Sequence, residues 1–238
     1  MKTVLLHLWI GCCAASPLIA QTDDSREPRQ AKGRVAWLVY TSMPEGLENP
    51  VTVITGKEII PLTLSKRSPS EPVKIPADGI IRLVRKVENP QDPGKPSYLT
   101  LAQATIPETV GKALVILVPV AKSPSGRVFQ AKVQDLADFT GGDCLFLNLT
   151  TLPIAVEMGT TKIGIKPGET KIHDAKDLTT STNVPIRYLF LPKEQKEWQL
   201  LSASTVVQHP TRREICIFSW DPRFERVDYH GITFPVTP

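Results

Sequence analysis

The stretch RVAWLVY at residues 34–40 is short, apolar and rich in β-branched and aromatic side chains. The runs IIRLVR at 80–85 and RYLFL at 187–191 have the same character. Turn-forming sequences separate such runs, among them PADG at 76–79 and KPG at 166–168. Short strands with turn signals roughly every 8–12 residues are typical of an all-β sandwich or barrel.

The proline content favours the same fold class. The chain has 22 prolines in 238 residues, nearly twice the usual share of about 5%. A proline inside a helix costs about 3 kcal/mol, because it removes a donor and clashes with the preceding turn. The sequence therefore predicts an all-β protein with only short helical turns, at residues 135–139, 175–178 and 193–198.

The two halves of the chain resemble each other. Residues 37–44 can be laid over residues 146–153, and Ile81-Arg82-Leu83 over Ile186-Arg187-Tyr188. An apolar run closes each half, at 113–118 and at 215–220. The offset is roughly 100 residues, the size of one immunoglobulin-like domain. An internal duplication is one explanation, and the shared residue preferences of all strands are the other.

We therefore expect two tandem immunoglobulin-like antiparallel β-sandwich domains. The first is predicted at residues 34–121 and the second at residues 128–238. The small, polar and turn-forming segment at 122–127 is the predicted linker. Residues 21–33 are charged and polar and are expected to form a flexible tail.

Residues 1–20 have the pattern of a secretory signal peptide. Lys2 precedes an apolar run of signal-peptide length, and Ala20 offers a small residue for cleavage. A run this short does not span a membrane as a helix. Lipid attachment at Cys12 is the less favoured alternative. We expect an exported protein, periplasmic or extracellular and of bacterial origin, with no transmembrane segment in the mature chain.

Cys144 and Cys216 are the two cysteines that remain after cleavage. Export makes a disulfide between them chemically feasible. Both lie in apolar strand-like runs, however, where a free buried cysteine is also common. Both pairing states stay open from the sequence.

Sequence motifs for catalysis are missing. The mature chain has three histidines, and none belongs to a zinc pattern. There is no nucleophile elbow, phosphate loop or dinucleotide fingerprint. We expect a protein that is not an enzyme and has no metal or cofactor. The alternative is a hydrolase whose site is assembled only by folding.

The segment 221–230 is the most unusual part of the sequence, because charges of both signs surround two aromatic residues. Arg223, Arg226 and Tyr229 are candidate binding residues, since arginine and tyrosine dominate interaction hot spots. Trp198 follows a charged run and is a further candidate. A solvated turn before the last strand is the competing interpretation of the segment.

The formal net charge of +4 comes from 28 basic and 24 acidic residues that are mixed along the chain. Nucleic-acid binders gather their basic residues on one surface, so we expect no nucleic-acid partner. The leading hypothesis is a non-catalytic envelope or extracellular module that binds envelope proteins or surface polysaccharide. A carbohydrate-binding module is the alternative, in which an exposed tryptophan stacks on sugar rings.

Overall fold

The computed structural model describes residues 33–89, 92, 94–120, 126–137, 139–175, 178–221 and 223–236. These residues form 16 strands in four four-stranded sheets and no helix, which confirms the predicted all-β sandwich fold. In the described parts of the three segments expected to hold helical turns, the backbone N–H groups of Phe139, Leu178 and Gln195 donate to the carbonyls of Leu136, Ala175 and Pro192, three residues earlier. The predicted signal peptide, Cys12 and nearly all of the predicted tail lie outside the described residues.

The first sandwich consists of two sheets, in the order β4-β1-β7-β8 and β3-β2-β5-β6. Its inner faces enclose one apolar core, which includes Leu38, Leu83 and Leu117. The strands are β1 (Val35–Tyr40), β2 (Val51–Thr55), β3 (Glu58–Leu62), β4 (Val73–Lys74), β5 (Ile80–Val87), β6 (Ser97–Thr105), β7 (Lys112–Pro119) and β8 (Phe129–Asp135).

The second sandwich repeats this arrangement, with sheets in the order β12-β9-β15-β16 and β11-β10-β13-β14. Its core includes Phe146, Tyr188 and Phe218. The strands are β9 (Cys144–Asn148), β10 (Ile154–Met158), β11 (Thr161–Ile165), β12 (Thr170–His173), β13 (Thr182–Phe190), β14 (Gln199–Gln208), β15 (Arg212–Asp221) and β16 (Arg226–Pro235).

The two sandwiches share their connectivity and their irregularities. In each, the first strand pairs in parallel with the seventh, and all other pairs are antiparallel. A register shift interrupts β5–β6 after Leu83 and β13–β14 after Tyr188. Gly56 and Gly159 supply the positive φ angles, 58° and 57°, that the matching hairpin turns require. The immunoglobulin-like assignment and the duplication itself stay hypotheses.

The strand pairing corrects one detail of the comparison between the halves. The alignment of residues 37–44 with 146–153 has to be shifted by one residue, so that Leu38 instead of Trp37 corresponds to Phe146. Leu38 and Phe146 both face their own cores, whereas Trp37 faces the space between the sandwiches. A slip of one residue turns every side chain of a strand to the other face.

The strand pairing also shows that the chain leaves the first sandwich after β8, later in the sequence than the predicted linker at 122–127. Residues 121–125 lie outside the described residues, but the strands on either side of them, β7 and β8, pair with each other. β8 therefore belongs to the first sandwich, and the chain crosses to the second between Asp135 and Cys144.

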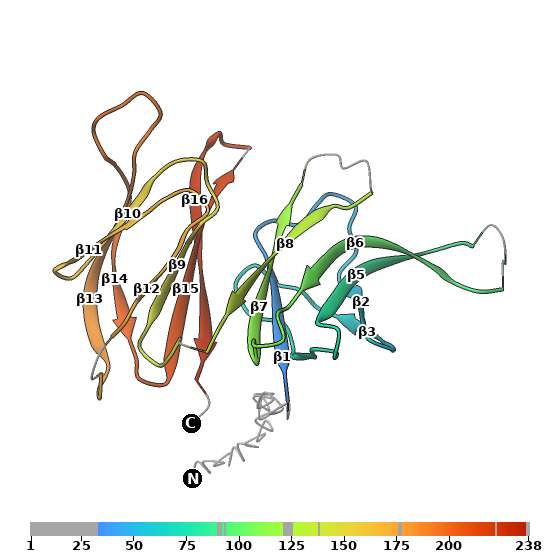
Figure 1. Cartoon of the computed structure of the whole chain (residues 1–238). Coiled ribbons are helices and arrows are strands. Elements are labelled where there is room, and N and C mark those ends of the chain that lie inside the picture. The colour runs from blue at the N-terminus through green and yellow to red at the C-terminus, as the bar shows by residue number, and fades with distance from the viewer. Residues whose placement is uncertain are drawn as a thin grey trace, which may run out of the picture.

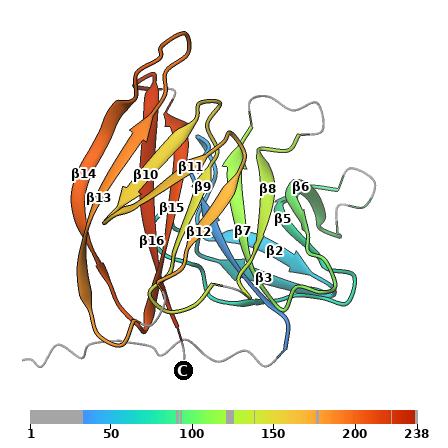
Figure 2. The ribbon, with the colours of Figure 1, turned by 60° about the vertical axis from the view of Figure 1, so that its left-hand side comes forward.

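The two sandwiches stack face to face through a third apolar core (Figures 1 and 2). Alternate residues of a strand point to opposite faces of its sheet. Leu114 and Ile116 of β7 enter this shared core, while Val115 and Leu117 enter the core of the first sandwich. This double burial explains why the run from Ala113 onwards is apolar at every position instead of alternating.

Polar residues also line the junction between the sandwiches. Arg213 on β15 donates a hydrogen bond to the Phe139 carbonyl, and its guanidinium lies 5.1 and 5.2 Å from the ring centroids of Phe139 and Phe234. Lys66 Nζ of the first half lies 3.5 Å from Asp228 Oδ2 of β16. Next to this ion pair His230 is buried, and neither of its ring nitrogens has a hydrogen-bond partner among the described residues. The two halves thus share both apolar and charged contacts.

Among the described residues, no helix has the length and apolar character that a membrane crossing requires.

Candidate binding groove at the end of the second sandwich

A groove of about 770 Å³ opens at one end of the second sandwich, and we call it the end groove. It lies between the β13–β14 loop and the β15–β16 hairpin, which both rise at the top of Figure 1. Most of its lining is apolar. The lining residues are Leu149, Thr150, Thr151, Leu152, Phe190, Pro192, Lys193, Gln199, Leu200, Leu201, Trp220, Glu225, Arg226 and Val227.

Large exposed apolar side chains gather at this end of the molecule. Leu200 and Trp220 line the groove and are 53% and 49% exposed, and the neighbouring Trp198 and Phe224 are 44% and 57% exposed. They are half of the large apolar side chains that the described residues expose. Clustered exposed apolar surface of this kind marks interaction sites in soluble proteins.

The β15–β16 hairpin holds its aromatic tip between two cations. The guanidinium carbons of Arg223 and Arg226 each lie 5.2 Å from the ring centroid of Phe224. The backbone N–H of Arg223 donates to the Asp221 carboxylate, 2.9 Å away, which fixes the turn. Two predicted binding residues therefore present an exposed phenyl ring beside the groove, and Arg226 also lines it.

Trp220 is exposed, although its apolar strand ICIFSW suggested a core position. It continues the inward-facing series of Cys216 and Phe218 on β15, but it lies one step beyond the end of the core. The following Asp221 starts the hairpin turn, and this proximity to a turn is the sequence signal that could have indicated exposure. Trp37, by contrast, is half-buried and packs against the shared core.

A buried phenylalanine of the first sandwich has a smaller counterpart in the lining of the end groove. Phe129 of β8 lies opposite Pro119, and Val227 of β16 lies opposite Trp220 at the matching register position. Both are buried. The phenyl ring packs into the first core, whereas the smaller valine lines the end groove.

A backbone hydrogen bond also closes the first sandwich at this point. The Val128 N–H donates to the Leu101 carbonyl over 2.9 Å and so ties β8 to β6. Leu101 is the residue that the β5–β6 register skips, and Leu201 is its counterpart in β13–β14. In the described part of the second sandwich no such backbone bond joins β14 to β16. Leu201 lines the open groove instead.

Tyr229 holds the two edge strands apart. Its counterpart in the first sandwich is Ala131, which lies opposite Leu117 as Tyr229 lies opposite Phe218. The Tyr229 hydroxyl is 2.9 Å from Ser202 Oγ on β14 and bridges the gap. Its ring packs against Tyr188 at a centroid distance of 4.7 Å. Tyr229 was predicted as a binding residue, and the structure places it between the sheets, below the groove.

The floor of the groove is a buried polar network, in which the side-chain amide of Asn148 has hydrogen-bond partners for both its nitrogen and its oxygen. Asn148 is fully buried, and its amide nitrogen donates to the carbonyls of Leu152 and Ile165 over 2.8 and 3.1 Å. Its oxygen accepts from the backbone N–H and the hydroxyl of Thr150. This network fixes the β9–β10 loop under the groove. Asn148 also begins the only Asn-x-Thr sequon of the chain, and burial withdraws its side chain from the surface.

Cys144 and Cys216 are free thiols in the structure. They lie on the paired strands β9 and β15 and both face the second core. Burial, with smaller contributions from nearby Glu214, raises the pKa of each thiol to about 12. A second cavity of about 370 Å³ reaches both cysteines from the gap between β14 and β16.

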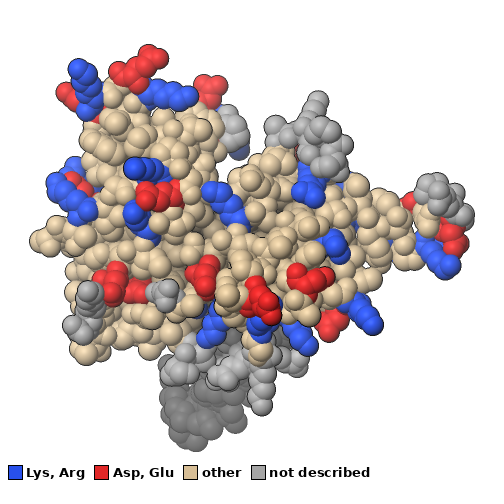
Figure 3. Space-filling model, viewed as in Figure 1, with Lys and Arg blue, Asp and Glu red and all other residues tan. Residues whose placement is uncertain are grey.

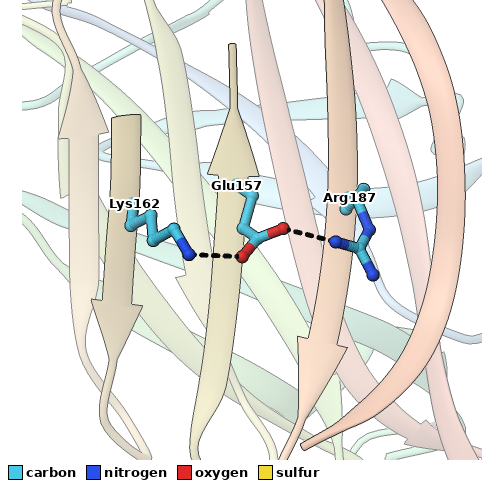
Figure 4. Close-up of polar contacts among 3 residues, drawn as sticks. All are labelled: Glu157, Lys162 and Arg187. Carbon is cyan, nitrogen blue, oxygen red and sulfur yellow. Dashed lines mark hydrogen bonds and ion pairs between the residues drawn. The ribbon is translucent and has the colours of Figure 1, made fainter. Parts of the chain in front are cut away.

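The outer face of the second sandwich carries an ion triad rather than a concave site (Figure 4). Glu157 on β10 lies directly opposite Lys162 and Arg187 on its two neighbouring strands. Its carboxylate oxygens are 3.1 Å from Lys162 Nζ and 2.8 Å from Arg187. The hydrogen bond from Lys162 is the main cause that lowers the pKa of Glu157, and Arg187 adds to it. We assign this triad to sheet pairing at a solvated surface.

Neither the charges nor the histidines point to another site. On the face shown in Figure 3, Lys and Arg are interspersed with Asp and Glu and form no continuous basic surface. Across the described residues, no three His, Cys, Asp or Glu side chains are grouped as a metal site would need. His173 and Asp174 follow each other at the end of β12, and Asp177, which could join them, lies outside the described residues.

Comparison with known proteins gives no family for this chain: no family model matches it, and no curated protein matches its sequence.

Proposed function

We propose that this chain is a non-catalytic binding module that contacts a protein or a surface polymer through the end groove. The observation that carries the proposal is that exposed Leu200 and Trp220 line one concave surface, with exposed Trp198 and Phe224 on the loop and hairpin that border it. Tryptophan and arginine are the residues most enriched in binding hot spots, and Arg226 lies in the same lining.

The proposal includes export to the periplasm or the extracellular space, on the leader pattern of residues 1–20. Envelope proteins and surface polysaccharides are the partners available there. A rigid sandwich that presents its recognition surface on end loops and hairpins is a common arrangement for binding proteins.

A carbohydrate-binding module is the second candidate. The specific observation that favours it is the exposure of the indole rings of Trp198 and Trp220, because an exposed indole face can stack on a sugar ring. The aliphatic part of the groove lining, with Leu149, Leu152 and Leu201, favours a protein segment instead.

The test compares the full chain with a groove-filled variant on arrays of random decapeptides and of glycans. Val227→Phe introduces the side chain that occupies the matching position of the first sandwich. We expect the unaltered protein to bind peptides or glycans on one of the two arrays. The binding signal of Val227→Phe should be at least about tenfold lower. Ile59→Lys, which changes an exposed apolar side chain of the other sandwich, is the matched control and should bind normally. Absence of any groove-dependent signal on both arrays would overturn the proposal.

A further inference from the structure

We infer that the ligand of the end groove is an extended peptide segment of a partner protein, with one aromatic anchor and acidic flanking residues. The inference rests on the proposed function and names the chemistry of its ligand. The first sandwich holds a segment of this kind within its own chain, at Val128 and Phe129.

In the first sandwich the segment is bound in two ways. The Val128 N–H donates to the Leu101 carbonyl over 2.9 Å. The next side chain, Phe129, points into the core and is almost completely buried. A backbone donor followed by an aromatic anchor therefore closes the gap between the edge strands β6 and β8.

The second sandwich has a counterpart of the acceptor residue Leu101, but in its described part no backbone N–H of β16 donates to β14. Leu201 matches Leu101 as the skipped residue of its strand pair, and it lines the groove together with Leu200. Val227 stands at the register position of Phe129 and lines the groove, where its smaller side chain leaves the volume of a phenyl ring unfilled by this residue. An acceptor on a strand edge beside an apolar hollow is the combination that β-strand addition uses: backbone bonds give affinity and side-chain pockets give specificity.

One feature keeps the gap between β14 and β16 open for an outside segment. The Tyr229–Ser202 bridge, at 2.9 Å, spans the space that Ala131 and Ala102 leave small in the first sandwich. Because the bridge consists of side chains, it satisfies neither a backbone donor nor a backbone acceptor of the edge strands. A partner segment does not need to displace a backbone bond in order to bind.

The charge of the rim selects the flanks of the segment. Lys193 and Arg226 line the groove against a single acid, Glu225. The lining therefore carries one positive charge in excess, and acidic residues on either side of the anchor complement it. The exposed Phe224 and Trp220 add aromatic surface for the anchor itself.

The probe is the synthetic peptide acetyl-EEVFQAE-amide, whose centre copies residues 128–131 and whose flanks are acidic. Binding to the full chain is followed by calorimetry and by the tryptophan fluorescence change. Replacing phenylalanine in the peptide by alanine should weaken binding at least about tenfold. N-methylation of the valine amide should weaken it about fivefold or more, since it removes one backbone donor. Lysine flanks in place of glutamate should weaken it about threefold or more, and more so at low salt.

Two protein variants locate the site, and each is checked for unchanged circular dichroism and melting temperature. Val227→Phe should weaken binding at least about tenfold by filling the anchor position. Leu200→Ala should weaken it at the rim, whereas Ile59→Ala, 52% exposed against 53% for Leu200, should not. Binding that survives Val227→Phe, or that ignores the phenylalanine of the peptide, overturns the inference.

The two proposals fail in distinguishable ways. If the peptide does not bind but cellohexaose or chitohexaose binds and is lost in Val227→Phe, the peptide inference is overturned and the proposed function stands. If neither the peptides nor the glycans bind in a groove-dependent way, both are overturned.

Discussion

Trp37 of the first sandwich meets Phe234 of the second edge to face, with ring centroids 5.4 Å apart and planes at 86°. The contact lies at the edge of the shared core and next to Arg213, whose guanidinium faces Phe234 from the same sheet. Residues almost 200 positions apart in the chain thus join the halves through an aromatic pair, and the pair offers a direct measure of their coupling.

Truncation of this pair should reveal the coupling between the sandwiches. Phe234→Ala should lower the free energy of unfolding by about 3–5 kcal/mol, because the ring is buried. A double-mutant cycle of Trp37→Ala and Phe234→Ala, measured by urea unfolding, should give a coupling of about 1 kcal/mol. The control cycle, Trp37→Ala with the distant Phe224→Ala, should be additive. Additivity of the first cycle would contradict the contact.

Tyr229→Phe should test the bridge between β14 and β16. The variant keeps the ring packing against Tyr188 and removes only the hydroxyl bonded to Ser202. We expect a loss of about 1 kcal/mol in unfolding free energy, the ordinary net value of one hydrogen bond. Ser202→Ala should cost a similar amount, and the double variant no more than either alone. A double variant that costs the sum of both would show that the two hydroxyls act independently.

His230 should make the stability of the protein depend on pH. Burial, and then the charge of Lys66, lowers the pKa of His230 to about 4, while Asp228 opposes this and Arg67 adds to it. The unfolded chain binds the proton near pH 6.5 and the folded chain only near pH 4, so stability falls as the pH is lowered through this range. The full loss is about 3 kcal/mol at about 1.4 kcal/mol per pKa unit.

The measurement is urea unfolding at several pH values between 7 and 4. His230→Leu should remove the histidine contribution and flatten the curve relative to the unaltered protein. Lys66→Gln removes a charge that lowers the His230 pKa, so the pKa of His230 in an NMR titration should rise. Curves for His230→Leu and the unaltered protein that stay parallel over this range would rule out the effect.

The two cysteines should be unreactive in the folded protein and free in the unfolded one. Burial raises the pKa of both thiols to about 12, so almost no thiolate is present at neutral pH. Titration with a thiol reagent should therefore find no fast-reacting group before unfolding and two groups afterwards. Two unreactive sulfurs after unfolding without a reductant would mean that Cys144 and Cys216 form a disulfide.

Individual side chains show which parts of the candidate site could be predicted from the sequence and which could not. Arg226 and Trp198 were predicted as binding residues from local composition, and the structure places them in or beside the end groove. Trp220 and Leu200 were missed, because exposure at the end of an apolar strand depends on where the core ends. The role of Tyr229 was also missed, since its effect comes from a distance between two sheets that no local pattern encodes.

Local sequence alone determined the strands and their repetition, because proline, turn residues and β-branched runs act within a few residues of one another. The stacking of the sandwiches and the hollow at the second sandwich's end were decided only by tertiary structure. Which face of β7 meets which core depends on the pairing register, and the groove is lined by residues from three separate loops and hairpins, with a valine standing where the first half has a phenylalanine. Both are consequences of contacts between residues far apart in the chain.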